Sequence, residues 1–170
     1  RNLVYMGSFM PYKNVETLVT AMRELPDHTL HLLSRIAPER RAELTALAGG
    51  ASVVFHDGVT DAAYAALLAD DAALVTTSLD EGYGLPVAEA LELGVPAVVT
   101  DMEIFREVAG DGALYVDPLD PEAVARAVRS LDEPGMRGRL VEAGTRHIRS
   151  FEWARSAKIL LAAATDLTRR

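Results

Sequence analysis

The stretch Ala73-Leu74-Val75-Thr76, followed shortly by Glu81-Gly82-Tyr83-Gly84-Leu85-Pro86-Val87-Ala88-Glu89, decides the fold. It indicates an apolar strand, a turn that contains two glycines, and a helix with proline in its first turn. The helix is otherwise almost wholly apolar, so Glu89 would be costly to bury there without a hydrogen bond or a ligand. A strand, a glycine turn and a helix in this order are typical of an α/β domain.

Short β-rich runs alternate with helical patterns along the rest of the chain. Several runs are apolar throughout, as in strands that are covered on both faces. Strands are expected at Leu3–Met6, Thr29–Ser34, Val53–Phe55, Ala73–Thr76, Ala97–Thr100 and Ala113–Val116. This alternation implies a doubly wound, Rossmann-like parallel sheet of about six strands, with helices on both faces.

Four helix starts are marked by a capping residue or by proline in the first turn. They are Asn14, Pro38, Asp61 and Asp120-Pro121. The first of these helices has an inward face at helical spacing, made by Val15, Leu18, Val19, Met22 and Leu25. Two further helices are expected near the end of the chain, over Pro134–Arg149 and Phe151–Leu167. The last carries an apolar row made by Trp153, Ala157, Leu160, Leu161 and Ala164.

The composition is that of a soluble globular domain, with 49% hydrophobic and 25% charged residues in 170. A formal net charge of -8 argues against a nucleic-acid surface, which normally carries a basic stripe. There is no cysteine for disulfides or thiolate sites, and the four histidines lack ligand spacing, so no metal is expected. No apolar run reaches the roughly 18 residues that span a bilayer. The chain begins directly in a strand, so we expect it to be part of a longer protein.

The loop after the first strand, Gly7 to Asn14, is the first candidate site, because open parallel sheets bind ligands beyond the carboxyl ends of their strands. Gly7 permits a close turn, and Lys13 puts a cation beside the N-terminus of the next helix. Free amides and the helix dipole favour an anion there. A tight turn with a solvated lysine explains the same residues, so the loop alone leaves both interpretations open.

The loop after the fourth strand repeats this arrangement. Gly82 and Gly84 expose backbone amides, and the helix from Leu85 points its N-terminus at the same place. Glu81 and Glu89 are good acceptors for sugar and ribose hydroxyls. Alternatively, Glu81 is a helix-dipole partner and Glu89 a surface residue, although the apolar neighbours of Glu89 make a surface position the weaker interpretation.

Together these loops resemble a known family. The run Glu81 to Glu89 is similar to the E-x-x-x-x-x-x-x-E signature of retaining, family-4-type glycosyltransferases of GT-B fold, in the form E-G-[FY]-G-L-P-x-x-E-A. Further matches occur in order at Tyr5-Met6-Gly7, Lys13-Asn14, Val53 to Val59, Gly94-Val95-Pro96, Glu107 to Pro118 and Phe151-Glu152-Trp153. The resemblance implies that residues 1–150 are the sugar-nucleotide domain of a two-lobed enzyme. Residues 151–170 would be a helix that crosses to an N-terminal, acceptor-binding lobe that this chain lacks.

The resemblance also implies roles for individual residues. Lys13 would neutralise the diphosphate of a nucleoside-diphosphate sugar, and Gly7 and Ser8 would also contact the donor. Glu81 would hold the donor sugar. Lys13 and Glu81 would act in catalysis. The sugar and phosphates would also contact Gly82, Tyr83, Gly84 and Leu85. Glu89 would accept hydrogen bonds from the ribose, and Val59 and Tyr64 would border the base.

For the whole enzyme, the resemblance implies transfer of a hexosyl group, with mannosyl as one candidate, and no metal or other cofactor. It implies a cytoplasmic setting and leaves open a peripheral association with the inner face of the membrane.

Two positions depart from the family pattern. Many members carry arginine beside the glycine of the first loop, where this chain has Ser8. The second strand usually ends in a glycine-rich turn, and here it ends Ser34-Arg35-Ile36. Arg35 therefore stands at a carboxyl strand end, where it could supply the missing positive charge.

Two other classes of function fit the sequence less well. A non-catalytic Rossmann-like interaction module has no need for Lys13, Glu81 and Glu89 together. A dinucleotide-dependent oxidoreductase domain would carry G-x-G-x-x-G after its first strand, and this chain does not. The sequence therefore favours the donor-binding half of a glycosyltransferase.

Overall fold

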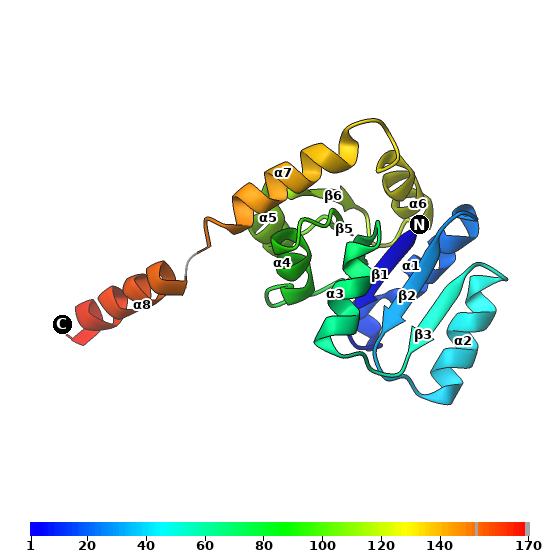
Figure 1. The fold of residues 1–170 in the computed structure, drawn as a ribbon. Helices are drawn as coiled ribbons and strands as arrows, with labels where there is room; N and C mark the ends of the chain where they lie inside the picture. Colours follow the sequence, from blue (N-terminus) through cyan, green and yellow to red (C-terminus); the bar gives the residue numbers. More distant parts are fainter. Residues whose placement is uncertain (152, 169–170) are drawn as a thin grey trace.

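The computed structural model, which describes residues 1–151 and 153–168, contains one parallel sheet of six strands in the order β3-β2-β1-β4-β5-β6. Its strands are β1 (Asn2–Met6), β2 (Thr29–Leu33), β3 (Val53–His56), β4 (Ala73–Thr76), β5 (Ala97–Thr100) and β6 (Ala113–Val116). The expected bounds agree with these to within one residue at each end. The doubly wound α/β fold is therefore confirmed (Figure 1).

Helices connect the strands and cover the sheet. They are α1 (Val15–Ala21), α2 (Pro38–Ala48), α3 (Asp61–Ala69), α4 (Leu85–Glu92), α5 (Glu103–Ala109), α6 (Pro121–Ser130), α7 (Met136–Ile148) and α8 (Trp153–Thr168). Short 3-10 turns lie at η1 (Pro11–Lys13), η2 (Met22–Glu24) and η3 (Gly110–Gly112).

A separate apolar core lies on each face of the sheet. On one face, Leu3 and Tyr5 of β1 pack with α1, α2 and α6, and the predicted inward residues of α1 are all buried there. On the other face, Val4 of β1 and Leu74 of β4 pack with α3, α4 and α5. Alternate residues of one strand thus enter different cores, which explains why these strands are apolar throughout.

The strand order reverses between β1 and β4. The chain moves from β1 outward to β2 and β3, then returns across β1 to β4 and continues outward to β5 and β6. The loops that follow β1 and β4 therefore leave the sheet side by side and turn to opposite faces, which opens a crevice between them. These are the two loops that the sequence selected.

Of the four expected helix starts, Asn14 stands at the N-cap position of α1, two others are correct and one is displaced by a residue. Pro38 begins α2, and the carboxylate of Asp120 accepts a hydrogen bond from the amide of Ala123 at the start of α6. Asp61 does not cap α3: the preceding Thr60 does, by accepting from the amide of Ala63 at 3.2 Å. Asp61 lies inside the first turn instead, where its charge favours the helix dipole.

Helix α8 extends away from the body beyond the end of α7 (Figure 1). Its apolar row is exposed, with Leu160 at 73% and Leu161 at 69% of full exposure. The side chain of Trp153, which was expected in the same row, lies outside the described residues. Across residues 1–151 and 153–168, no helix has both the length and the apolar character to cross a membrane.

Candidate functional site

The loops after β1 and β4 are joined by hydrogen bonds at the switch point. The amide of Leu79 donates to the carbonyl of Tyr12 at 2.7 Å, and the hydroxyl of Thr77 donates to the carbonyl of Asn14 at 2.8 Å. The first contact precedes Lys13 in the chain and the second follows it. The position of Lys13 is therefore fixed from both sides by the β4 loop.

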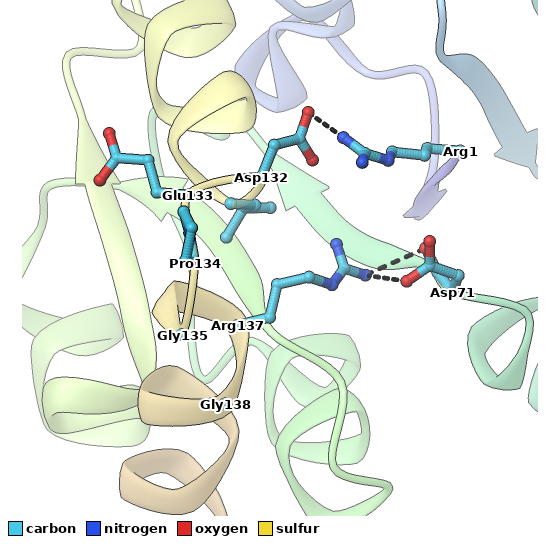
Figure 2. Close-up of a pocket in the computed structure, with 9 residues that line it drawn as sticks. Arg1, Asp71, Asp132, Glu133, Pro134, Gly135, Arg137 and Gly138 are labelled. Carbon is cyan, nitrogen blue, oxygen red and sulfur yellow. Dashed lines mark hydrogen bonds and ion pairs between the residues drawn. The ribbon is translucent and has the colours of Figure 1, made fainter.

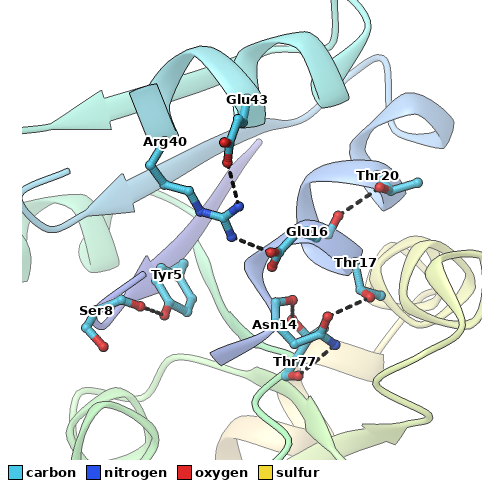
Figure 3. A network of polar contacts seen from close by, with 9 residues as sticks. All are labelled: Tyr5, Ser8, Asn14, Glu16, Thr17, Thr20, Arg40, Glu43 and Thr77. Atoms are coloured by element: carbon cyan, nitrogen blue, oxygen red, sulfur yellow. Dashed lines mark hydrogen bonds and ion pairs between the residues drawn. The ribbon is translucent and has the colours of Figure 1, made fainter. Parts of the chain in front are cut away.

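Asn14 is the main junction between these loops (Figure 3). Its side-chain amide donates to the carbonyls of Thr77, at 3.2 Å, and Pro118, at 2.6 Å, and its side-chain oxygen accepts from the hydroxyl of Thr17. Asn14 precedes α1 as expected, but its side chain makes no capping bond to the helix amides. Its φ of 47° is left-handed, a conformation that asparagine tolerates better than most residues. Asn14 therefore occupies the expected N-cap position without the expected capping bond, and its side chain joins three loops instead.

The turn that opens the first loop depends on Tyr5. Its buried hydroxyl donates to the carbonyl of Ser8 at 2.6 Å (Figure 3), and burial raises the pKa of this phenol, which keeps it a donor. A Cβ on Gly7 would lie 2.8 Å from the same hydroxyl oxygen. Gly7 is therefore required for the turn, and Tyr5 is a part of the site that was not predicted.

The two glycines of the β4 loop have different constraints. Gly84 stands at the N-cap of α4 with a φ of 85°, and a Cβ there would lie 2.6 Å from the ring of Phe105. Gly82 is exposed, and a Cβ there would meet nothing within 4 Å. The fold thus requires a glycine at 84, whereas at 82 it leaves open space above the backbone.

The start of α4 offers unused hydrogen-bond donors. Within the described part of the chain, no acceptor engages the amides of Gly82, Tyr83, Gly84 and Leu85. The positive end of the helix dipole lies at the same place. This turn can therefore accept an anion, as the sequence indicated.

Lys13 and Glu81, predicted from separate motifs, meet across the crevice. The Nζ of Lys13 lies 2.5 Å from Oε1 of Glu81, and each side chain retains 15% of its full exposure. The cation comes from the end of η1 and the carboxylate from the loop before α4. The crevice therefore contains a half-buried ion pair next to four free amides.

Glu89 occupies a different environment from the one expected. It is exposed, because the inward face of α4 consists of Val87, Ala90 and Leu91. The apolar residues around it in sequence, Leu85 and Leu93, are themselves 59% and 55% exposed. Glu89, Leu85 and Leu93 line a cavity of about 630 Å³, together with Tyr83. Glu89 is thus a surface residue, which was the weaker interpretation from the sequence, and it lines a cavity with an apolar wall.

Tyr64 lies near Glu89 on the neighbouring helix. Its side chain is 8% exposed, and its buried hydroxyl lies within reach of the carboxylate of Glu89. Burial raises the pKa of Tyr64, and the charge of Glu89 raises it further. Val59 packs against the same apolar core as Tyr64. Val59 and Tyr64 therefore share one face of the sheet, and Glu89 is close enough to Tyr64 to act on its hydroxyl.

Arg35 is exposed and stands on the far side of the crevice. Its Nε would lie 4.0 Å from a Cβ on Gly58, in the turn after β3. It makes no hydrogen bond or ion pair within the described residues. Nearby, Nδ1 of His31 and Nε2 of His56 are 3.0 Å apart, and His31 also contacts Asn2. In the parts of the chain that the structure describes, no group of His, Asp and Glu is arranged to hold a metal ion.

A second charged region lies at the amino ends of the same two central strands (Figure 2). It is a hollow of about 280 Å³ in which Arg1 pairs with Asp132 and Arg137 pairs with Asp71. Arg137 also donates to the carbonyls of Asp71 and Ala72. Parallel sheets rarely bind ligands at this end, and these charges neutralise one another, so we do not regard it as the site.

Sequence reasoning missed the residues that hold the loops in place. Thr76, the last residue of β4, and the following Thr77 and Ser78 form an unbroken hydroxyl run, and all three are buried. Thr77 bonds to Asn14, Thr76 to Ser78, and the carbonyl of Ser78 accepts from Thr100. A polar run at the carboxyl end of a buried strand was the available signal.

Comparisons with known proteins show which family the chain is similar to. Residues 1–147 match the family model "Glycosyl transferases group 1". The chain is 30% identical over 159 residues to an O-antigen chain mannosyltransferase B from Escherichia coli, which covers 88% of the chain and 42% of that protein. The sucrose-phosphate synthase of Thermosynechococcus elongatus superposes with a TM-score of 0.82 at 27% identity, over 99% of the chain and 45% of the synthase.

A further likeness concerns the fold alone. The Anabaena protein HepE, solved in complex with UDP and glucose, superposes with a TM-score of 0.79 at 18% identity, over 97% of this chain and 48% of that one. The chain thus spans less than half of the length of each of these three proteins. With a family model matched over residues 1–147 and a GT-B-like Rossmann domain observed throughout, the chain belongs to the group 1 glycosyltransferase family.

Proposed function

We propose that this chain is the donor-binding half of a retaining glycosyltransferase that transfers a hexosyl group from a nucleoside-diphosphate sugar. One observation carries the proposal: a half-buried lysine, a carboxylate and four free amides converge at the switch point of the sheet. The lysine and the amides suit a diphosphate, and the carboxylate suits the hydroxyls of a sugar, so the combination fits a molecule that contains both.

Lys13 and the amides of 82–85 would act on the leaving group. As the bond between the sugar and the diphosphate breaks, negative charge grows on the diphosphate, and an oriented cation with fixed N–H donors stabilises it. Ser8 and Gly7 would border the same phosphates. Glu81 would accept hydrogen bonds from the donor sugar. No metal or other cofactor is part of the proposal.

The nucleoside would lie on the side of Glu89. An exposed carboxylate can accept both ribose hydroxyls without a large desolvation cost. Val59 and Tyr64 would border the base. Arg35 would add the positive charge that Ser8 does not supply, and its place beside Gly58 favours a contact from the base side of the diphosphate.

The complete enzyme would have a second, acceptor-binding lobe. Residues 1–150 would form the sugar-nucleotide domain, and the helix within 151–170 would cross to that lobe, which accounts for its exposed apolar row. The chain alone would bind donor and transfer nothing. For the whole protein we propose a cytoplasmic location and leave its association with a membrane surface open.

Mannose is the sugar that the relatives favour. The Escherichia coli relative is named as a mannosyltransferase, and HepE was solved with UDP and glucose, so a nucleoside diphosphate with a hexose is the class of donor. Of the parts of the donor, the nucleotide base is the one that the sequence constrains least.

Calorimetric titration with UDP, GDP, ADP and their hexose conjugates tests the proposal. At least one nucleoside diphosphate should bind in the micromolar to millimolar range. Absence of binding by all of them at millimolar concentration would contradict it. Sugar transfer by the chain alone would contradict the role of the second lobe. An Arg35→Ala variant that binds as tightly as the parent would remove Arg35 from the site.

A further inference from the structure

The cation that the proposed function assigns to the diphosphate already has a partner. The ammonium of Lys13 lies 2.5 Å from the carboxylate of Glu81, and the two side chains are equally shielded, at 15% exposure. No other acid pairs with Lys13 among the described residues, and the ring of Tyr12 lies 5.2 Å from its Nζ. In the ligand-free chain the two groups therefore neutralise each other.

Among the residues that the structure describes, no cation other than Lys13 pairs with Glu81. It lines a cavity of about 350 Å³ with Asp80, Glu103 and Glu107, so its surroundings are otherwise acidic. A diphosphate that takes Lys13 from Glu81 leaves this carboxylate unpaired, next to phosphate oxygens and close to other acids. Like charges at such distances repel, and a half-buried carboxylate without donors is costly.

A hexose removes this cost, because its hydroxyls donate to the released carboxylate. A free nucleoside diphosphate has no hydroxyl at that end. We propose that Glu81 is a specificity-determining residue: by pairing with Lys13, it makes the site favour the sugar conjugate over the free nucleoside diphosphate. This inference rests on the proposed function and deepens it.

The same exchange acts in the opposite direction after transfer. Once the hexose has left, Glu81 again lacks donors and competes for Lys13, which weakens the hold on the diphosphate. The ion pair therefore also favours release of the product, a step that is rate-limiting in many enzymes.

A charge-neutral variant tests this inference by calorimetry. Glu81→Gln keeps the shape of the side chain but frees Lys13, so the affinity for free UDP, GDP or ADP should rise about tenfold, which is roughly what one charge-assisted contact contributes. The affinity for the matching hexose conjugate should rise less or fall. The ratio of the affinity for the hexose conjugate to that for the free nucleoside diphosphate should therefore be closer to one in Glu81→Gln than in the parent. Asp80→Asn is the matched control, since it removes a charge from the same cavity without touching Lys13, and it should leave the preference intact.

A second measurement needs no ligand. The chain has two lysines, Lys13 and Lys158, so selective 15N and 13C labelling of lysine side chains gives two NMR signals. Glu81→Gln should move the signal of Lys13 and not that of Lys158, and Asp80→Asn should move neither. Backbone spectra of the variants verify that they are folded.

The outcomes separate the two proposals. If parent and variants bind no nucleoside diphosphate, the proposed function fails and this inference fails with it. If the parent binds one and Glu81→Gln binds it no tighter, the inference alone is overturned. An unchanged Lys13 signal in Glu81→Gln would also overturn it, because the ion pair would then be absent in solution.

Discussion

The two ends of the central strands β1 and β4 contain the same kind of contact in two different settings. At the amino ends, Arg137 and Asp71 lie 3.3 Å apart, with side chains 27% and 67% exposed. At the carboxyl ends, Lys13 and Glu81 lie 2.5 Å apart, and each side chain is 15% exposed. An exposed pair contributes little to stability or chemistry, whereas a shielded pair responds strongly to a change in its surroundings.

The neighbours of each pair differ more than the pairs themselves. Arg137 contacts the carboxylate and the carbonyl of Asp71 and the carbonyl of Ala72 through one nitrogen, Nη2, so this pair is bonded to the backbone of a neighbouring loop. Lys13 has one carboxylate, and the free amides at the start of α4 lie beside it. An ion pair in a cleft thus indicates a binding site when the groups around it lack partners, and a structural contact when they do not.

The largest expected effect is the loss of stability when a glycine is replaced by alanine, at Gly84 near the carboxyl ends of the strands and at Gly135 near their amino ends. Gly84 and Gly135 both precede a helix with positive φ, 85° and 80°, but an added Cβ meets the Phe105 ring at 2.6 Å in the first case and nothing within 4 Å in the second. Alanine costs about 1–2 kcal/mol at either position for the left-handed backbone, and overpacking adds about 1–3 kcal/mol at Gly84. Urea unfolding should therefore show Gly84→Ala to be the more destabilised. Equal losses would mean that Phe105 moves aside freely.

The next largest effect separates the two cations. Lys13→Ala should weaken binding of a nucleoside diphosphate roughly 10- to 150-fold, because a charge-assisted contact is worth about 1.5–3 kcal/mol. Arg137→Ala should leave the affinity unchanged and lower the free energy of unfolding instead. Calorimetry and urea unfolding on both variants test this. Unchanged affinity in Lys13→Ala would remove the functional difference between the two ends.

A smaller effect is expected where the carboxyl-end loops are held together. Asn14→Ala deletes the bonds to the carbonyls of Thr77 and Pro118 and should cost about 1–3 kcal/mol of stability. Because those bonds position Lys13, ligand affinity should fall as well. Asn14→Gly is the control, since it loses the same bonds but accepts the φ of 47° without strain. A stable Asn14→Ala variant with normal affinity would show that the loops hold their positions without it.

The strands and most helix positions could be predicted because local chemistry determines them. Ala73–Thr76, Ala97–Thr100 and Ala113–Val116 are apolar runs between turn residues, and the observed strands have the same bounds. Both loops of the crevice followed from their glycines and charged residues and from the rule for carboxyl ends. The pairing of Lys13 with Glu81 was not predicted, although both residues were selected, because sequence gives the ends of strands and not the direction of side chains.

The errors arose where distant contacts outweigh local ones. Asn14 has the chemistry of a cap, yet its amide bonds to carbonyls 63 and 104 residues away. Thr60 and Asp61 are both good caps, and sequence alone did not separate them. Glu89 was misplaced because its apolar neighbours were counted without their angles around the helix: two positions beyond the buried Val87, it points away from the core.

The smallest expected effect concerns pH at the amino end. His28 lies just before β2, is 7% exposed, and has a buried Nδ1 without a partner among the described residues. Burial lowers its pKa below that of the unfolded chain, and the charge of Asp132 opposes this shift without cancelling it. The folded state thus binds fewer protons in the range below about pH 6.5, so stability is fully present above that range and declines as the pH falls through it.

Replacement of His28 by Gln should make this decline shallower, by less than about 1.4 kcal/mol for each pH unit, which is the limit for one proton. Urea unfolding between pH 7.5 and pH 5 measures it. Ligand affinity at pH 7.5 should not change, because His28 stands at the opposite end of the sheet from Lys13. An altered affinity would show that the two ends are coupled through the strands, whereas an unchanged slope would mean that His28 is already protonated or hydrated in the folded chain.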